Sequence, residues 1–145
     1  MVVASPTATF GLPEALRGIY AGAGGLPRLL RNVGLPLASE IAMTGRFLSA
    51  NEALKFNLVN KVSASLGSVV DEAVQMAQKV AGISPDAIIV TRAALREAWE
   101  NGSVERAYQI SDERWRDGLF AGENSKEGLK AFKEKREPKW VPSKL

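Results

Sequence analysis

Residues 10–25 read Phe-Gly-Leu-Pro-Glu-Ala-Leu-Arg-Gly-Ile-Tyr-Ala-Gly-Ala-Gly-Gly, and they place one carboxylate, Glu14, shortly before a glycine-rich loop that begins at Gly22. The loop leads into an apolar pattern with three- and four-residue spacing, which predicts a helix. Glycines let a backbone approach a ligand closely, and free amides at the start of a helix can donate to an anion, a water or a developing oxyanion. The stretch therefore combines a group able to move a proton with amides able to hold a polar ligand. A surface glutamate beside a tight turn is the alternative interpretation of the same residues.

Two common nucleotide motifs are absent from this loop. Gly22 and Gly24 lack the third glycine of the dinucleotide fingerprint, and no Lys-Ser/Thr pair follows them as in a phosphate-binding loop. The chain has no cysteine and no histidine. Disulfides, zinc-thiolate sites, thiol nucleophiles and a histidine base are thereby excluded, and we expect no metal site. Acid–base chemistry must fall to carboxylates, lysine or tyrosine.

The composition is that of a folded protein with one core. Of the 145 residues, 46% are hydrophobic and 24% are charged, so we expect a single folding unit. The net charge is +3, from 19 basic and 16 acidic residues, and lysine is densest in residues 126–139, where three glutamates interrupt it. This pattern predicts a solvated helix face, with a local phosphate contact as the alternative, and no nucleic-acid partner. No apolar run approaches the roughly 20 residues that cross a bilayer, so no membrane span is expected.

Local signals predict a mostly helical chain. Ser49 and Glu52 form a capping-box pattern, Ser84 precedes a proline that suits a first helical turn, and Gly34 and Gly45 are placed to end helices. The sequence predicts strands or extended segments at residues 1–5 and 58–62, and helices at residues 26–33, 37–43, 69–80, 85–101, 104–119 and 127–137, with one more starting after residue 49. The C-terminal half is therefore expected to be helical.

Several stretches, taken in order, resemble the enoyl-CoA hydratase/isomerase (crotonase) superfamily. Residues 10–14 and 22–25 resemble its signature region, residues 38–62 resemble its A-x-E-x-x-x-T-G and L-V-x-x-V stretches, and residues 127–140 resemble its C-terminal ending. The resemblance implies an α/β fold of the ClpP/crotonase spiral type, of which this chain is the C-terminal, predominantly helical portion. Residues 1–60 are then the end of the spiral core with the catalytic glutamate loop, residues 61–145 are the C-terminal helical oligomerisation region, and the N-terminal half of the family fold is absent.

The resemblance also implies an activity and three site residues. The substrate is a coenzyme A thioester, and no cofactor is needed. Glu14 matches one of the family's two catalytic glutamates, which transfers a proton at the α-carbon, and Gly22 matches a glycine whose backbone amide helps to hold the attacking water. Lys135 resembles a lysine that reaches a coenzyme A phosphate; an exposed helical lysine without a binding role is the alternative interpretation.

The chain departs from the family pattern in two ways. The second catalytic glutamate and both oxyanion-hole amides of the family lie upstream of the position that matches Met1. In addition, Ala21 stands where many hydratases have proline, and Asn57 where glycine is common. These differences leave the exact reaction open.

Three functions remain under consideration. The first is an enoyl-CoA hydratase that converts a 2-enoyl-CoA to a 3-hydroxyacyl-CoA in peroxisomal fatty-acid β-oxidation or a related acyl-CoA pathway. The second is an enoyl-CoA double-bond isomerase, and the third is a truncated, catalytically incompetent member that acts only as an assembly partner. Family resemblance implies homotrimers or hexamers. Aromatic residues in the C-terminal helices predict that these helices bury the interface, namely Trp99, Tyr108, Trp115 and Phe120.

The last three residues form a targeting motif. The C-terminal tripeptide matches the peroxisomal import signal Ser-Lys-Leu, here Ser143, Lys144 and Leu145. It predicts a peroxisomal location and an import receptor as a partner. Pro138 and Pro142 prevent the preceding helix from continuing, so we expect the tail to be accessible.

Overall fold

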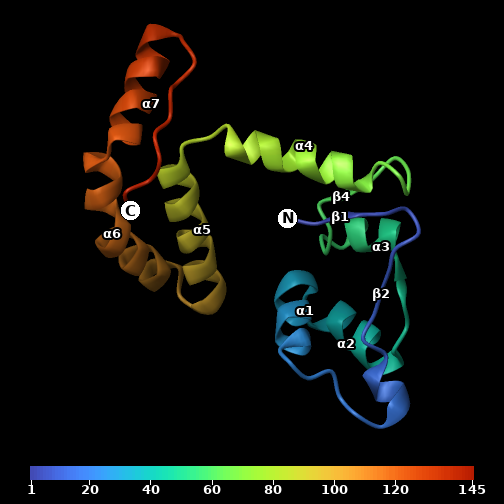
Figure 1. The fold of residues 1–145 in the computed structure, drawn as a ribbon. Helices are drawn as coiled ribbons and strands as arrows, with labels where there is room; N and C mark the ends of the chain where they lie inside the picture. Colours follow the sequence, from blue (N-terminus) through green and yellow to red (C-terminus); the bar gives the residue numbers. More distant parts are fainter. The chain divides into compact units, whose positions relative to one another are not determined.

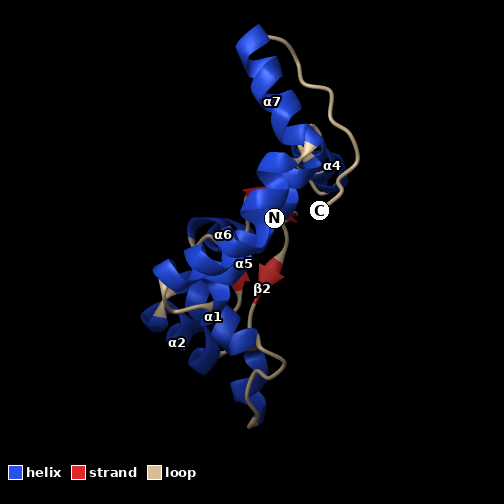
Figure 2. Cartoon of the chain, turned by 90° about the vertical axis from the view of Figure 1, so that its left-hand side faces the viewer, coloured by secondary structure: helices blue, strands red, loops and turns tan.

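Helices make up most of the chain, and each strand is only two residues long (Figures 1 and 2). The computed structural model describes all of residues 1–145. They pack as two compact units, Met1–Met76 and Ala77–Leu145. The reason is that the strands and first helices pack among themselves, whereas the last three helices pack on one another.

The first unit holds all the strands. Its elements are β1 (Val3–Ala4), β2 (Thr9–Phe10), the 3₁₀-helix η1 (Pro13–Arg17), α1 (Gly25–Val33), α2 (Leu35–Thr44), β3 (Leu48–Ser49), α3 (Ala50–Lys55), β4 (Lys61–Val62) and the start of α4 (Val69–Ala81). Strand β1 pairs in parallel with β4, and β2 pairs antiparallel with β3. The sequence predicts every α-helix of this unit and extended segments at β1 and β4. It does not predict η1, β2 or β3.

Small side chains form the core of this unit. Ala4, Ala50, Ala53 and Val59 are buried together. Four partly buried hydrophobic residues pack against them: Ala8, Phe10, Leu58 and Val62. Because alanine leaves room for close backbone approach, α3 can pack directly under the β1–β4 pair.

Helix α3 begins as its sequence predicts. The Ser49 hydroxyl accepts from the Glu52 N–H at 3.3 Å, and the Glu52 carboxylate accepts from the Ser49 N–H at 2.9 Å, which completes the capping box. Arg46 donates to the same carboxylate at 3.0 Å and to Glu40 at 2.6 Å. One arginine thus ties the end of α2 to the start of α3.

The second unit consists of helices and the C-terminal tail. After the end of α4 come α5 (Pro85–Glu100), α6 (Val104–Ala121) and α7 (Glu123–Glu134). Helices α5 and α6 form an antiparallel hairpin, with Ser84 and Ser103 as N-caps as predicted. No helix of the chain is both long and apolar enough to span a bilayer.

The last helix differs from its predicted bounds. It begins at Glu123 rather than residue 127 and ends at Glu134, because Lys135 adopts a left-handed conformation (φ 54°) that stops it. The following Arg136 turns back to form a two-bond ion pair with Glu127, at 2.7 and 2.9 Å. This contact fixes the reversal of the chain after α7.

The C-terminal tail does not continue α7, as predicted, but it is held against the rest of the second unit by hydrogen bonds (Figure 1). The buried Asn124 side chain accepts from the Val141 N–H and donates to the Val141 carbonyl, both at 2.9 Å, and its amide also donates to Asp86. Further along, Lys144 pairs with Glu123. Prolines end the helix, but long-range hydrogen bonds then hold the tail against α7.

Candidate active site

Glu14 lies in the first turn of η1, directly after strand β2. Pro13 occupies the start of this turn, where its missing N–H costs nothing. Gly18 ends it in a left-handed conformation (φ 73°), and the Ile19 N–H donates to the Glu14 carbonyl at 3.3 Å. The backbone that carries the carboxylate is therefore fixed on both sides.

The carboxylate of Glu14 has one oxygen without a partner. The residue is half-buried, and its Oε2 atom is buried without a hydrogen bond. A buried acceptor left unsatisfied costs free energy, so native structures contain few of them. In a group that the sequence singled out for proton transfer, this oxygen is a ready acceptor.

Turn η1 is anchored against the end of α2. Gly45 caps α2 with φ 64°, and a Cβ atom built on it would lie 2.6 Å from Cγ of Leu16. Gly11, just before the turn, is also close to a neighbour, since a Cβ on it would lie 2.8 Å from the Phe47 ring. Two glycines thus let the segment around Glu14 lie against its neighbours.

The glycine-rich loop forms a tight turn before α1. The Gly25 N–H donates to the Gly22 carbonyl at 3.1 Å, and the two residues between them have positive φ, 53° at Ala23 and 81° at Gly24. Positive φ at both central positions is the pattern of a type I′ turn. Gly22 is exposed, its N–H donates to no group of the chain, and a Cβ on it would meet nothing within 4 Å. Its amide is therefore free to bind a ligand.

Arg28 reaches back from α1 to this loop. Its Nη1 donates to the Gly24 carbonyl at 3.1 Å and to the Ala23 carbonyl at 3.4 Å. The sequence analysis did not single out this arginine. Its place four residues after Gly24, one helical turn away, is the signal that would have found it.

An apolar groove of about 440 Å³ is lined by Leu12, which precedes the glutamate turn, and by Gly25 at the end of the glycine loop. Neither Glu14 nor Gly22 lines it. It is lined by residues of β2, α1 and α2 and by the segment that precedes Glu14, among them Phe10, Leu12, Leu29, Ile41 and Leu48. Arg28 and Asn32 are polar residues on its wall. Such a mainly apolar wall with a few polar groups is typical of a ligand site.

The charges around the site are paired. Hydrogen bonds from the backbone and side chain of Ser49, and then from Arg46, lower the pKa of Glu52. The pKa of Arg46 is raised, first by Glu40 and then by Glu52. Glu52 is therefore held ionised in a structural role, whereas Glu14, which does not line the groove, keeps an unpartnered buried oxygen.

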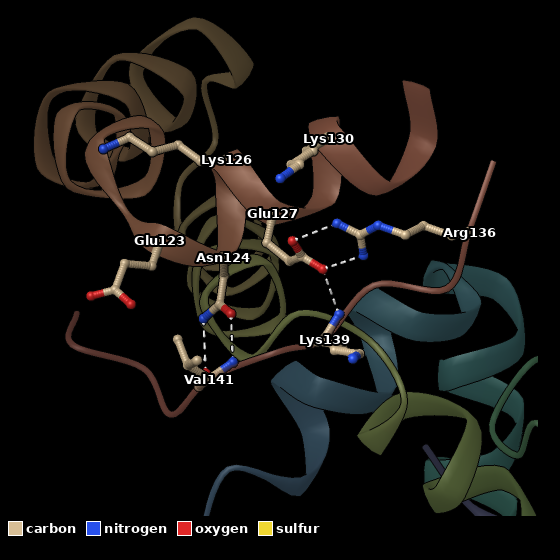
Figure 3. Close-up of a pocket in the computed structure, with 8 residues that line it drawn as sticks. All are labelled: Glu123, Asn124, Lys126, Glu127, Lys130, Arg136, Lys139 and Val141. Atoms are coloured by element: carbon tan, nitrogen blue, oxygen red, sulfur yellow. Dashed lines mark hydrogen bonds and ion pairs between the residues drawn. The ribbon is translucent and has the colours of Figure 1, made fainter. Parts of the chain in front are cut away.

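The second unit holds a separate hollow between α7 and the tail, of about 540 Å³ (Figure 3). Three lysines line it: Lys126, Lys130 and Lys139. Arg136 also lines it and lowers the pKa of Glu127 to about 2, with help from the Lys139 N–H. Lys135 is exposed at the end of α7 and is not among the lining residues.

The predicted site residues thus fall in two places. Glu14 and Gly22 both lie on the segment that joins β2 to α1, in the first unit. Lys135 and the terminal tripeptide lie in the second unit. The catalytic and binding roles of these residues remain predictions.

Comparison with known proteins agrees with the resemblance. The family description that matches the chain is enoyl-CoA hydratase/isomerase, over residues 1–143. The chain belongs to this family. Solved structures of the enoyl-CoA hydratase/isomerase family superpose on it: an enoyl-CoA hydratase from Mycobacterium marinum with a TM-score of 0.90 at 33% identity, and one from Mycobacterium tuberculosis H37Rv with 0.89 at 32%. Each match covers 99% of this chain and 56% of the other, which confirms the expected crotonase fold.

Two curated members of the family also match the chain over most of its length. The chain is 49% identical over 145 residues to a mevalonyl-coenzyme A hydratase from Beauveria bassiana, and 40% identical over 139 residues to a 2,3-dehydroadipyl-CoA hydratase from Escherichia coli. The matches cover 100% and 95% of this chain but 52% and 53% of those proteins. The chain therefore spans about half the length of the curated family members that it matches.

Proposed function

We propose that this chain carries the C-terminal half of the active site of a 2-enoyl-CoA hydratase. The observation that carries the proposal is the unpartnered, buried Oε2 of Glu14, held by a fixed turn shortly before the free amide of Gly22. The names of the family members, which are hydratases or dehydratases of coenzyme A thioesters, support the same chemistry.

In the proposed reaction, water adds across the C2–C3 double bond of the thioester. The water oxygen bonds to C3, and a proton is delivered to C2, where negative charge develops next to the thioester carbonyl. Glu14 gives this proton in hydration and takes it back in dehydration. The Gly22 N–H donates to the oxygen of the attacking or leaving water, which fixes its direction of approach.

The chain alone lacks part of this site. A second carboxylate must exchange the water proton, and two amides must hold the developing enolate oxygen; by resemblance both belong to a segment upstream of Met1. Removing one such donor typically costs a hundredfold or more in rate. We therefore expect the isolated chain to be nearly inactive and activity to require the upstream half.

The substrate that we propose is mevalonyl-CoA or its dehydrated 2-enoyl form. Two mevalonyl-coenzyme A hydratases, from Beauveria bassiana and Aspergillus fumigatus, are 49% and 47% identical to the chain. Mevalonyl-CoA is a 3-hydroxy thioester, so loss of water between C2 and C3 gives a 2-enoyl thioester, in keeping with the role of Glu14. A straight-chain 2-enoyl-CoA of peroxisomal β-oxidation is the alternative, which the terminal Ser143-Lys144-Leu145 favours.

We further propose that the enzyme is a homo-oligomer of three or six chains. Exposed apolar side chains on α6 and α7 support assembly through these helices, including Val104 at 85%, Phe120 at 63% and Phe132 at 86% exposure. Lys135 is our candidate for a coenzyme A phosphate contact. Recognition of the terminal tripeptide by an import receptor would then take the protein to peroxisomes.

The test joins the chain to residues encoded upstream or, failing these, to the corresponding half of the Aspergillus fumigatus hydratase. The joined protein is incubated with mevalonyl-CoA and with straight-chain 2-enoyl-CoA, and the conjugated thioester is followed by its ultraviolet absorbance. We expect interconversion of the mevalonyl pair with gain or loss of one water. A double-bond shift without water would indicate an isomerase, and no turnover with either substrate would indicate an inactive assembly partner.

A further inference from the structure

The turn that presents Gly22 is held in an unfavourable conformation. Ala23 has φ 53°, a left-handed conformation that a residue with a Cβ adopts at a cost. No side chain caps the start of α1, where Gly24 is the N-cap residue. The Gly25-to-Gly22 hydrogen bond by itself does not explain why an alanine stays in this conformation.

Arg28 supplies the missing restraint. Its single Nη1 atom donates to the carbonyls of both central residues of the turn, at 3.1 Å to Gly24 and 3.4 Å to Ala23. A Cβ on Gly24 would lie 2.2 Å from this nitrogen, so the contact needs a glycine there. The Arg28 N–H also donates to the Gly24 carbonyl at 3.4 Å, which makes the arginine part of the helix that the turn opens.

We propose that Arg28 is a positioning residue for the reaction: it holds the Gly22–Gly25 turn so that the Gly22 N–H points at the reacting water. The inference rests on the proposed function of Gly22. Arg28 also lines the apolar groove, so its effect on the turn must be separated from any contact with the substrate. It acts by holding the carbonyls of Ala23 and Gly24, and so the tight turn that the Gly22 residue opens.

This role predicts a specific kinetic change. Without Arg28 the turn samples other conformations, and the Gly22 amide is misdirected in the transition state, which lowers kcat. Loss of a substrate contact in the groove would instead raise KM. In the joined enzyme, Arg28→Ala should lower kcat about tenfold, the factor given by the free energy of one ordinary hydrogen bond, with KM unchanged within about twofold. Arg28→Lys should lie between the two, because its ammonium lacks the planar fork of a guanidinium.

A second-site change separates positioning from general stability. Glycine takes positive φ without cost, so Ala23→Gly placed in the Arg28→Ala enzyme should restore part of the lost kcat. The matched control is Arg92→Ala, an exposed arginine on α5 in the other unit, which should leave kcat unchanged. Thermal unfolding of every variant shows whether the folded fraction has changed.

The outcomes are distinct. A kcat loss that Ala23→Gly repairs supports the inference, whereas unchanged kcat, or a raised KM with normal kcat, overturns it. If Glu14→Gln abolishes hydration while Arg28→Ala is harmless, the inference fails and the proposed function stands. If the joined enzyme itself shows no turnover, the proposed function fails. Amide hydrogen exchange at Gly22–Gly25 then decides whether Arg28 restrains the turn at all, since unchanged exchange in Arg28→Ala would dismiss the restraint too.

Discussion

Gly45 offers a sharp test of how the glutamate turn is held in place. It ends α2 with φ 64°, and a Cβ atom there would lie 2.6 Å from Cγ of Leu16 in η1. Gly45→Ala therefore faces two costs. The left-handed backbone costs an alanine about 1–2 kcal/mol, and the new methyl group must displace Leu16.

The structure indicates which cost is larger. Leu16 is 66% exposed, so its side chain can swing toward solvent at little expense. The backbone conformation cannot change without unwinding the cap of α2. We therefore expect Gly45→Ala to lower the free energy of unfolding of the first unit by about 1–3 kcal/mol, mainly through backbone strain.

Gly45→Asn distinguishes the two contributions. Asparagine is larger than alanine but tolerates left-handed φ better, so it should be the less destabilising substitution if strain dominates. Urea unfolding should be followed by far-UV circular dichroism, because all three tryptophans lie in the second unit. An asparagine variant less stable than the alanine variant would show that the contact with Leu16 dominates and that our reasoning is wrong.

Three further predictions concern charge, catalysis and targeting. Hydrogen bonds from Lys61, the largest cause, and from Ser68 and the Ala64 N–H lower the pKa of Glu72 from 4.5 to about 2. The ionised Glu72 therefore stabilises the fold above about pH 4.5, and this stabilisation is lost as the pH falls toward 2. In Lys61→Met, the free energy of unfolding of the first unit should depend less steeply on pH over this window, as measured by urea unfolding at several pH values. In the joined enzyme, Glu14→Gln should reduce kcat for hydration at least a hundredfold with little change in KM, and an unimpaired variant would assign the proton transfer to another group. Deleting Leu145 should leave thermal unfolding unchanged and abolish peroxisomal import of a fluorescent fusion, and continued import would place the signal elsewhere.

Elements with local signals were predictable from the sequence. Ser49 and Glu52 are three residues apart and cap α3 with their own side chains, and Ser84 with Pro85 starts α5 in the same local way. Membership of the family also followed from motifs in order along the chain. In each case the residues that decide the structure are neighbours in sequence.

Features that depend on distant contacts were not predictable. Turn η1 lies against Gly45, and Asn124, near the start of α7, binds Asp86 and Val141. Neither hydrophobic periodicity nor a capping motif in the sequence indicates which distant residues will be in contact. The same holds for the candidate site, where motif resemblance singled out Glu14 and Gly22 but the hold of Arg28 on the glycine turn appeared only in three dimensions.

The pairing of β1 with β4 sets the order in which the first unit can form. Val2 exchanges two hydrogen bonds with Asn60, at 2.7 and 2.9 Å, across a separation of 58 residues. Loop-closure entropy makes such a contact slow compared with the neighbouring-helix contacts of α5 and α6. Strand β1 therefore has no strand to pair with until the segment around Asn60 has closed back on it, so this pairing should be among the later contacts of the first unit to form.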